Sequence, residues 1–271
     1  MLSAKLLGFY IAITSLFCPC KKEDPSLGWQ TVRAEYRIER VGRFRFPESS
    51  GLALGPQPGT YYTVQDGGNA PILWLIDEQG TVLDSLPIAA DNVDWETLTQ
   101  SADGRVWVGD LGNNQDWRKD LKIFEANSPS EPLRIRYADQ TPEQDHPYTQ
   151  WDSEGLYHYA DSLTWFSKQR QGDSTRVFRI PDQPGRYTVT PVQSLSLARG
   201  ITGAALRPDG RQVAALGYGR IYFFALHESQ LTPEGCLWWP FNGQAEAILY
   251  LDERTLLVTN EAGKIWRVSR R

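Results

Sequence analysis

The sequence predicts an all-β protein folded as a five-bladed β-propeller, with a six-bladed propeller as the alternative. Three observations lead to this prediction. No long stretch places apolar residues at helical spacing, short alternating runs bounded by Gly, Pro and Asp recur throughout, and one short pattern occurs five times. The chain has 271 residues, of which 41% are apolar, and this is enough for one large domain with a core.

Composition excludes several classes of function. The chain carries 28 basic and 33 acidic residues, a formal charge of −5, and its Lys and Arg residues cluster only in pairs or triplets. A nucleic-acid partner is therefore not expected. Three histidines and three cysteines are too few for a zinc site, and they also supply little for Ser–His–Asp or Cys–His catalysis. We expect a monomer.

The N-terminal residues 1–20 are typical of a secretory signal. Lys5 precedes an apolar run at 6–17, which is too short to span a bilayer permanently. Cys18 and Cys20 follow, and residues 21–30 form a polar tether. This segment resembles a bacterial lipoprotein signal, so a lipid anchor on Cys18 or Cys20 and a bacterial envelope location are expected, with no other membrane contact. A plain secretory signal is the alternative. Cys236 is expected to be a buried small side chain.

The repeated pattern consists of a polar residue, any residue, then Ser, Glu or Thr, a small residue and an aliphatic one. Its five copies lie at 48–52, 94–98, 152–156, 200–204 and 244–248, and the fourth begins with Gly in place of the polar residue. The central residues are Ser50, Glu96, Glu154, Thr202 and Glu246, which are 46, 58, 48 and 44 residues apart. Each spacing suits one four-stranded propeller blade.

The sequence pattern also predicts individual strands and the way the ring of blades closes. Alternating runs predict strands at 61–64, 72–76, 106–108, 176–180 and 221–225. The last copy leaves room for only three strands, so the segment 31–46, which alternates like a strand, is predicted to complete the final blade. The propeller then covers 31–271, with an insertion at 139–150. Six blades would require one more, degenerate copy of the pattern.

The repeated central residues are expected to face one another. The innermost strand of each blade lines the channel of a propeller, so three carboxylates and two hydroxyls would meet there. Crowded carboxylates cannot all stay ionised without a cation or bound protons. Because the donors are all oxygen atoms, calcium is the predicted ligand of Ser50, Glu96, Glu154, Thr202 and Glu246. A water-filled, purely structural channel is the alternative.

A second polar ring is predicted where each second strand returns toward the repeated pattern. Counting 14 to 16 residues onward gives Asp66, Asp110, Lys168, Tyr218 and Asn260 with Glu261, and Asn69, Asn113 and Arg170 lie in the same loops. These residues are predicted to surround one channel mouth and bind a small or polymeric ligand. Ordinary turn chemistry is the alternative for each of them. Trp95, Trp117 and Trp151 are candidates for stacking on a sugar ring.

The ordered series of central residues resembles the calcium-activated nucleotidase (apyrase) family of five-bladed propellers. Segments 106–112 and 163–170 are similar to that family's corresponding segments, whereas Asp94-Trp95-Glu96 and 49–52 resemble SdiA-regulated-type envelope propellers. The resemblance implies a central calcium held by the five central residues. The sequence departs from the nucleotidase pattern at Asp66-Gly67-Gly68 and at Lys168-Gln169-Arg170, so the resemblance implies fold and ion more than activity.

Two main functions remain open from the sequence. The first is an envelope-anchored, calcium-binding propeller that acts as a ligand-binding or scaffold module through one channel mouth. The second is a calcium-dependent hydrolase of phosphoanhydrides or esters, with Asp66 or Asp110 as the general base and Lys168 and Arg170 neutralising developing charge. A partner protein whose mouth binds no ligand is a third possibility. Whether the chain is an enzyme is left open by its sequence.

Overall fold

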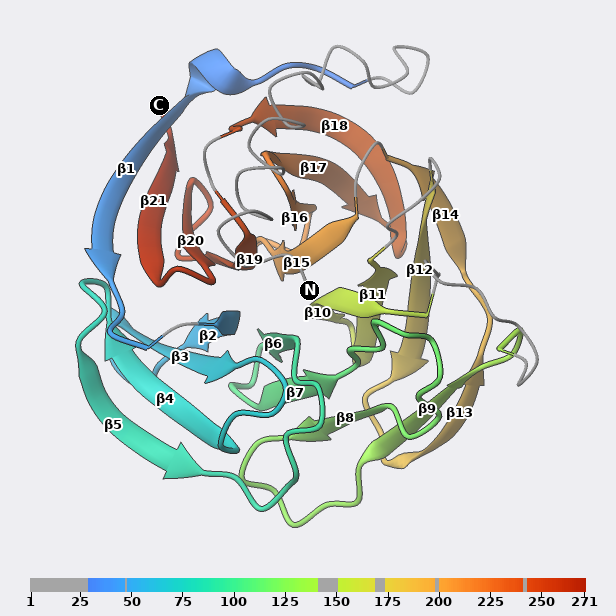
Figure 1. Ribbon diagram of the computed structural model, residues 1–271. Coiled ribbons are helices and arrows are strands. Elements are labelled where there is room, and N and C mark those ends of the chain that lie inside the picture. The colour runs from blue at the N-terminus through green and yellow to red at the C-terminus, as the bar shows by residue number, and fades with distance from the viewer. Residues whose placement is uncertain (1–28, 47, 141–150, 169–173, 198–199, 241–242) are drawn as a thin grey trace.

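Five small β-sheets surround a central channel in the computed structural model, which describes residues 29–46, 48–140, 151–168, 174–197, 200–240 and 243–271 (Figure 1). Apart from a single 3₁₀ turn at Arg33–Glu35, the regular elements of the described residues are strands. The predicted fold class, a five-bladed all-β propeller, is confirmed, and the six-bladed alternative is wrong. Among the described residues, no helix has the length and apolarity needed to cross a membrane.

Each blade runs outward from the channel in the order of its strands. Blade 1 comprises β2 (Ser49–Leu54), β3 (Thr60–Gln65), β4 (Ile72–Asp77) and β5 (Val82–Pro87). Blade 2 comprises β6 (Thr97–Gln100), β7 (Val106–Asp110), β8 (Lys122–Glu125) and β9 (Leu133–Tyr137). Blade 3 comprises β10 (Ser153–Tyr159), β11 (Ser162–Ser167), β12 (Ser174–Pro181) and β14 (Gln193–Ser196). The strand predictions at 61–64, 72–76, 106–108 and 176–180 are thus confirmed.

The remaining two blades complete the ring. Blade 4 comprises β15 (Ile201–Leu206), β16 (Gln212–Gly217), β17 (Arg220–His227) and β18 (Gln230–Trp238). Blade 5 comprises β19 (Ala245–Tyr250), β20 (Thr255–Asn260), β21 (Lys264–Arg270) and β1 (Tyr36–Arg43). One strand departs from this scheme, because β13 (Gly185–Val189) leaves blade 3 and pairs in parallel with β9 of blade 2. The prediction at 221–225 is confirmed by β17.

The N-terminal strand closes the last blade, as predicted. β1 pairs antiparallel with β21 from Tyr36↔Arg270 to Arg43↔Lys264. The strand is shorter than the predicted 31–46, because the chain turns at Arg33–Glu35 and Thr31 instead bridges to Cys236 on β18. Cys236 is buried, as predicted, and it is also disulfide-bonded, a state that the sequence did not predict. Closure joins both ends of the described chain to the same ring.

The repeated pattern encodes a β-bulge on the innermost strands. The register between first and second strands skips one residue in blades 1, 3, 4 and 5, and the skipped residues are Ser50, Glu154, Thr202 and Glu246. In blade 2 the equivalent Glu96 lies directly before β6 and donates its N–H to Gly109 O. A bulge re-aims one side chain without breaking the strand. The central residues are therefore placed at equivalent backbone positions.

The small residue that follows each central residue lets neighbouring inner strands approach closely. A Cβ at Gly51 of β2 would clash with the backbone nitrogen of Leu98 on β6, and one at Gly203 would lie 2.8 Å from Glu246 O. At both positions the neighbour is backbone that cannot move aside cheaply. The spaces between blades are then filled by large apolar side chains such as Trp107, Tyr137 and Trp165, all buried.

Candidate metal centre at the channel mouth

The five central residues of the pattern all lie buried on or beside the innermost strands. Ser50, Glu96, Glu154, Thr202 and Glu246 are each at most 5% exposed. The hydroxyls of Ser50 and Thr202 donate to backbone carbonyls, Glu48 O at 3.4 Å and Ala245 O at 2.6 Å. The metal role of these five residues stays a prediction. The structure separates them into two kinds: the carboxylates lie close to other acidic side chains, whereas the two hydroxyls bond to the backbone.

The second strands return to the repeated pattern, as the residue count predicts. The N–H of Asp66 donates to Glu48 O at 3.0 Å, and the N–H of Lys168 donates to Asp152 O at 2.7 Å. The same contact recurs in blade 5, where the Glu261 N–H donates to Gln244 O at 3.0 Å. These backbone bonds fix the ends of the second strands beside the first residue of each copy. The polar side chains of both rings therefore share one channel mouth.

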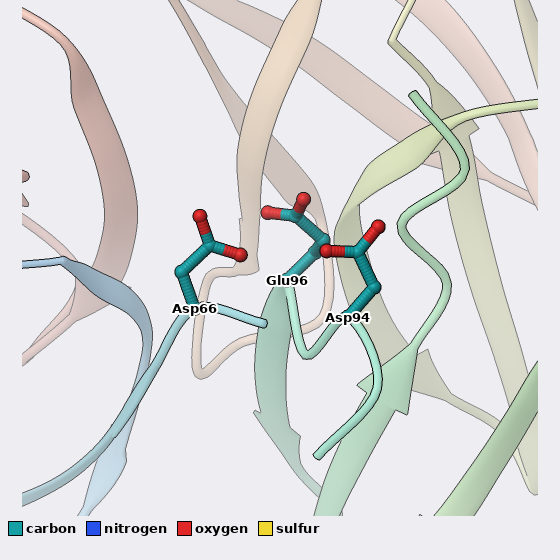
Figure 2. Close-up of side chains that lie close together, drawn as sticks. All are labelled: Asp66, Asp94 and Glu96. Atoms are coloured by element: carbon teal, nitrogen blue, oxygen red, sulfur yellow. The ribbon is translucent and has the colours of Figure 1, made fainter. Parts of the chain in front are cut away.

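Two overlapping groups of carboxylates form at this mouth. Asp66, Asp94 and Glu96 each offer an oxygen within 4.8 Å of the others, and their carboxyl groups lie close together in Figure 2. Glu96, Asp152 and Glu154 form the second group with the same spacing. Glu96 belongs to both groups. We call these five residues the acidic cluster.

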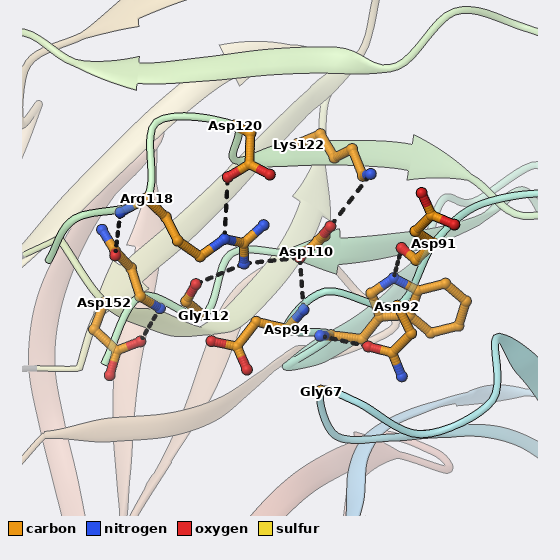
Figure 3. Close-up of polar contacts among 12 residues, drawn as sticks. Gly67, Asp91, Asn92, Asp94, Asp110, Gly112, Arg118, Asp120, Lys122 and Asp152 are labelled. Carbon is orange, nitrogen blue, oxygen red and sulfur yellow. Dashed lines mark hydrogen bonds and ion pairs between the residues drawn. The ribbon is translucent and has the colours of Figure 1, made fainter. Parts of the chain in front are cut away.

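Neighbouring blades hold the acidic cluster in place (Figure 3). The Asn113 N–H of blade 2 donates to Asp152 Oδ1 of blade 3 at 2.8 Å. The Asn92 amide donates to Asp66 O of blade 1 at 3.0 Å, and Asn92 Oδ1 accepts from the Trp95 N–H at 3.0 Å. Asp152 and Asp66 are thus each positioned by a loop of the adjacent blade. Such support keeps the carboxylates in one arrangement before a ligand arrives.

Asp110 serves a different purpose from the other acids. It is fully buried, its Oδ1 accepts from the Asp94 N–H at 3.0 Å and contacts Arg118 Nη1 at 2.9 Å, and its Oδ2 lies 3.4 Å from Lys122 Nζ. Arg118 also donates to Gly112 O at 2.7 Å (Figure 3). Asp110 therefore anchors the loop that carries Asp94. Its charge is compensated within the protein, so it is poorly placed to exchange protons with a substrate.

Lys168 is the one predicted ligand-binding cation among the described residues, and it points into the cluster. It is 9% exposed, forms an ion pair with Glu154 Oε1, and lies 5.7 Å from the centroid of the Tyr218 ring. Burial by itself lowers the pKa of Lys168, but the nearby Glu154 and Glu246 carboxylates raise it well above its usual value. Lys168 is therefore a permanent internal cation. It neutralises only one of the surrounding negative charges.

The blade 5 side of the mouth carries two further carboxylates. Tyr218 donates its hydroxyl to Glu246 Oε1 at 3.1 Å, and the Gln244 amide donates to Glu261 Oε1 at 2.6 Å. Burial, and next the charge of Glu246, raises the pKa of Glu261 to about 8. Burial also raises the pKa of Glu246. These groups extend the negative field of the acidic cluster without belonging to either group of three.

Burial and mutual repulsion disturb the protonation of the acidic cluster. Burial, followed by the charges of Glu154 and Asp66, raises the pKa of Glu96 well above its usual value. Burial raises the pKa of Glu154 as well, and Lys168 opposes this effect. Burial and the charges of Asp66 and Asp152 raise the pKa of Asp94 to about 6. Without another cation, the cluster must keep protons near neutral pH.

The cluster fits a divalent cation by the chemistry of its donors. All of them are carboxylate oxygens, the ligands that calcium and magnesium prefer. Glu154 Oε2 and Glu246 Oε2 are buried and have no hydrogen-bond partner within the described chain. A buried carboxylate oxygen without a partner is costly. A cation between these side chains would satisfy such oxygens and remove the repulsion that raises their pKa values.

The other predicted mouth residues lie in the expected loops but bond within them. The Asn69 amide donates to Glu48 Oε2 and to Asp66 O, both at 2.9 Å, and Asn113 Oδ1 accepts from the Arg118 N–H at 2.9 Å. Asn260 is 3% exposed, and its Oδ1 accepts from the Lys264 N–H at 2.9 Å. Their contacts agree with turn chemistry, and their ligand-binding role stays a prediction. Arg170, Cys18, Cys20 and residues 141–150 of the insertion lie outside the described residues.

The sequence reasoning missed Asp94 and Asp152 as members of the site. A signal was present, because three of the five copies begin with an acid, namely Glu48, Asp94 and Asp152. Alternate residues of an extended chain point to the same side, so an acid two positions before a central residue was a candidate ligand. Of the tryptophans proposed for stacking, Trp95 and Trp151 are buried, which excludes them, whereas Trp117 is 66% exposed.

Comparisons with known proteins bear on the fold. No protein-family model and no curated sequence matches the chain, so its resemblance to nucleotidase and SdiA-regulated-type propellers stays a prediction. Among solved structures, a gluconolactonase from Xanthomonas campestris is 16% identical with a TM-score of 0.52, covering 88% of this chain and 91% of that chain. A glucose dehydrogenase is 12% identical with a TM-score of 0.51, covering 87% and 99%. At these identities the similarity shows a shared propeller fold.

Proposed function

We propose that this protein is a divalent-cation-binding propeller in which calcium, held by the acidic cluster, helps to bind a small or polymeric ligand at the channel mouth. The observation that carries the proposal is the convergence of Asp66, Asp94, Glu96, Asp152 and Glu154 into two overlapping groups with ligand distances within 4.8 Å.

Lys168 suggests which of the two groups holds the cation. Its ammonium group pairs directly with Glu154 Oε1, so the group of Glu96, Asp152 and Glu154 already has a positive charge beside it. Asp66, Asp94 and Glu96 form no ion pair with another described residue, and Asp66 and Asp94 are only half-buried, which leaves them open to the mouth. We therefore assign the calcium to Asp66, Asp94 and Glu96. Water or a ligand oxygen would complete its coordination.

Calcium titration of the chelator-treated protein tests whether the acidic cluster binds the cation. We expect calcium to raise the melting temperature, because a cation that binds only the folded state stabilises it by mass action. In Glu96→Gln the chelated protein should melt no lower than the chelated wild type, since the change removes a repelling charge, and calcium should no longer raise it. Glu131→Gln, at a side chain 84% exposed, is the control and should respond like the wild type. An unchanged response in Glu96→Gln would contradict the proposal.

A metal-dependent hydrolase is the second candidate function, and Asp94 is the observation that favours it. A general base works best with a pKa near the working pH, and burial with the charges of Asp66 and Asp152 brings the pKa of Asp94 to about 6. Asp94 is half-buried at the mouth, whereas Asp110 is fully buried and ion-paired. A bound cation would polarise a carbonyl or phosphoryl oxygen there. For this function the cation would occupy the other group, Glu96, Asp152 and Glu154, which leaves Asp94 free, and we propose Asp94 as the residue that takes the proton from water.

Turnover assays decide between binding and hydrolysis. Nucleoside diphosphates, phosphoesters and sugar lactones would be tested with calcium, and the last of these follows the gluconolactonase that shares the fold. Turnover that requires calcium and is lost in Asp94→Asn, while calcium still raises the melting temperature of that variant, would establish the hydrolase. If no substrate is converted while calcium still stabilises the protein, the binding function stands alone. Attachment to the bacterial envelope through Cys18 or Cys20 remains part of the proposal for this protein's location.

A further inference from the structure

A groove with a volume of about 590 Å³ lies at the outer edge of blade 2, where β13 pairs with β9 (Figure 1). It is far along the blade from the innermost strand β6 and involves none of the acidic cluster. Four of its lining residues are basic and exposed: Lys119, Arg134, Arg136 and Arg186. We call this site the basic groove.

The strand register brings like charges directly opposite one another. Arg134 of β9 is the partner of Lys122 on β8 and also of Arg186 on β13, so three basic residues form a row across three strands. Like charges on directly opposite residues destabilise a sheet. Lys122 is relieved by Asp110 Oδ2 at 3.4 Å, whereas folding alone gains nothing from placing Arg134 opposite Arg186. An anion bound along the row would convert the repulsion into attraction.

Among the described residues, few carboxylates neutralise the groove cations. Within the described part of the chain, Lys119, Arg136 and Arg186 have no carboxylate within 4.0 Å, and Arg134 reaches only Glu131 at 3.9 Å, whose side chain is 84% exposed. Asp120 lines the groove, but it pairs with Arg118 at 3.2 Å. The chain as a whole has a formal charge of −5, so an excess of positive charge here is a local feature.

Protection of a sheet edge explains charged edge strands in general, but it does not require charges of a single sign. The outermost strand of blade 5 shows the difference. On β1, Arg37 pairs with Glu39 at 3.2 Å, and Arg270 of the adjacent strand pairs with Glu35 at 2.8 Å. That edge is charged and balanced. The edge of blade 2 is charged and unbalanced.

We propose that the basic groove binds an acidic oligosaccharide, a sugar chain that carries carboxylate or phosphate groups. Guanidinium groups match both oxyanions with paired hydrogen bonds. Thr188, which is exposed and lies opposite Arg136 on the face of the basic residues, offers a hydroxyl that can hydrogen-bond to a sugar. The volume of the groove is in the range of small-ligand sites. Long duplex nucleic acid is disfavoured by the acidic charge of the rest of the protein.

Calorimetric binding assays test this proposal on the full chain in chelator, so that the acidic cluster cannot recruit ligands through calcium. The probes are hexagalacturonate, a phosphorylated maltohexaose, neutral maltohexaose and inorganic phosphate. We expect either acidic sugar to bind at low ionic strength and to weaken as salt increases. The variant Arg186→Glu should bind at least about tenfold more weakly. Arg40→Glu, an exposed arginine on the outermost strand of blade 5, is the matched control and should bind like the wild type.

The other outcomes overturn the proposal. Equal binding of neutral maltohexaose would show that charge is not recognised, and equal binding of inorganic phosphate would show a simple anion site in place of a sugar site. Equal loss in Arg40→Glu would show an unspecific effect of net charge. An absence of binding to both acidic probes at low salt would leave the basic groove without this ligand. None of these results depends on calcium, so they test the basic groove independently of the proposed metal centre.

Discussion

The acidic cluster at the channel mouth and the basic groove at the rim both gather charges of one sign, but they differ in contact with water. Glu96 and Glu154 are at most 5% exposed, and burial with mutual repulsion raises their pKa values. Arg136 and Arg186 are exposed, where water and salt screen their repulsion. Buried side chains of like charge therefore require a bound proton or a cation. Exposed side chains of like charge can stay ionised side by side and remain available to bind a ligand of opposite charge.

The largest expected effect concerns the internal cation of the mouth. Lys168→Met leaves Glu154 without its ion-pair partner, and removal of one partner from a buried pair typically costs about 3 to 5 kcal/mol of unfolding free energy. Urea denaturation at neutral pH with chelator measures this loss. Calcium should restore more stability in Lys168→Met than in the wild type, because the metal supplies the missing positive charge. Lys119→Met, at an exposed lysine, is the control. Equal stability of the two variants would show that Lys168 does not compensate the cluster.

A smaller effect is expected from pH. Burial and nearby charges raise the pKa of Asp94 from 3.8 to about 6 and that of Glu261 from 4.5 to about 8. For each group, the folded state binds more protons than the unfolded state at pH values between the unfolded-state and folded-state pKa. The resulting stabilisation is complete below the unfolded-state pKa and is lost as pH rises through the folded-state pKa. The chelated protein should melt several degrees lower at about pH 8 than at about pH 5. Calcium should reduce this trend, and a chelated protein that becomes more stable over this range would contradict it.

The smallest effect is expected at the rim. Arg186→Gln removes a positive charge opposite Arg134, so it should raise the unfolding free energy slightly, by at most about 0.5 kcal/mol. The gain should disappear in high salt, since exposed charges are screened. Denaturation at low and high salt measures both values. A marked loss of stability in Arg186→Gln would show that this arginine is structural, and would weaken the contrast between the two regions.

Much of the fold could be predicted because the repeat is local in the sequence. The pattern around Glu154 and Thr202 specifies a bulge, and the following Gly155 and Gly203 permit close packing of inner strands. The closing role of the N-terminal strand followed from the missing fourth strand of the last blade. The parallel pairing of β13 with β9 could not be predicted, because it joins strands of two different blades and leaves no periodic signal.

The candidate site was predicted in part. Asp66 and Lys168 were expected at the mouth from residue counting, and both second strands end beside the repeated pattern. The count gave no means of distinguishing Asp110, which is fully buried and paired with Arg118, from Asp66, which faces the mouth. That difference depends on the loop that carries Arg118 back to Asp110. Such a contact is set by chain packing and not by spacing from the pattern.

The sequence by itself determined the propeller class, the order of the inner strands and the equivalent placement of Ser50, Glu96, Glu154, Thr202 and Glu246, because periodic spacing and local bulge chemistry depend only on neighbouring residues. Tertiary structure alone decided which acids meet. Asp66, Asp94 and Asp152 come from three different blades and gather with Glu96 and Glu154 only when these blades pack side by side. Their protonation is likewise a property of the assembled mouth, since burial and the charges of other blades set it.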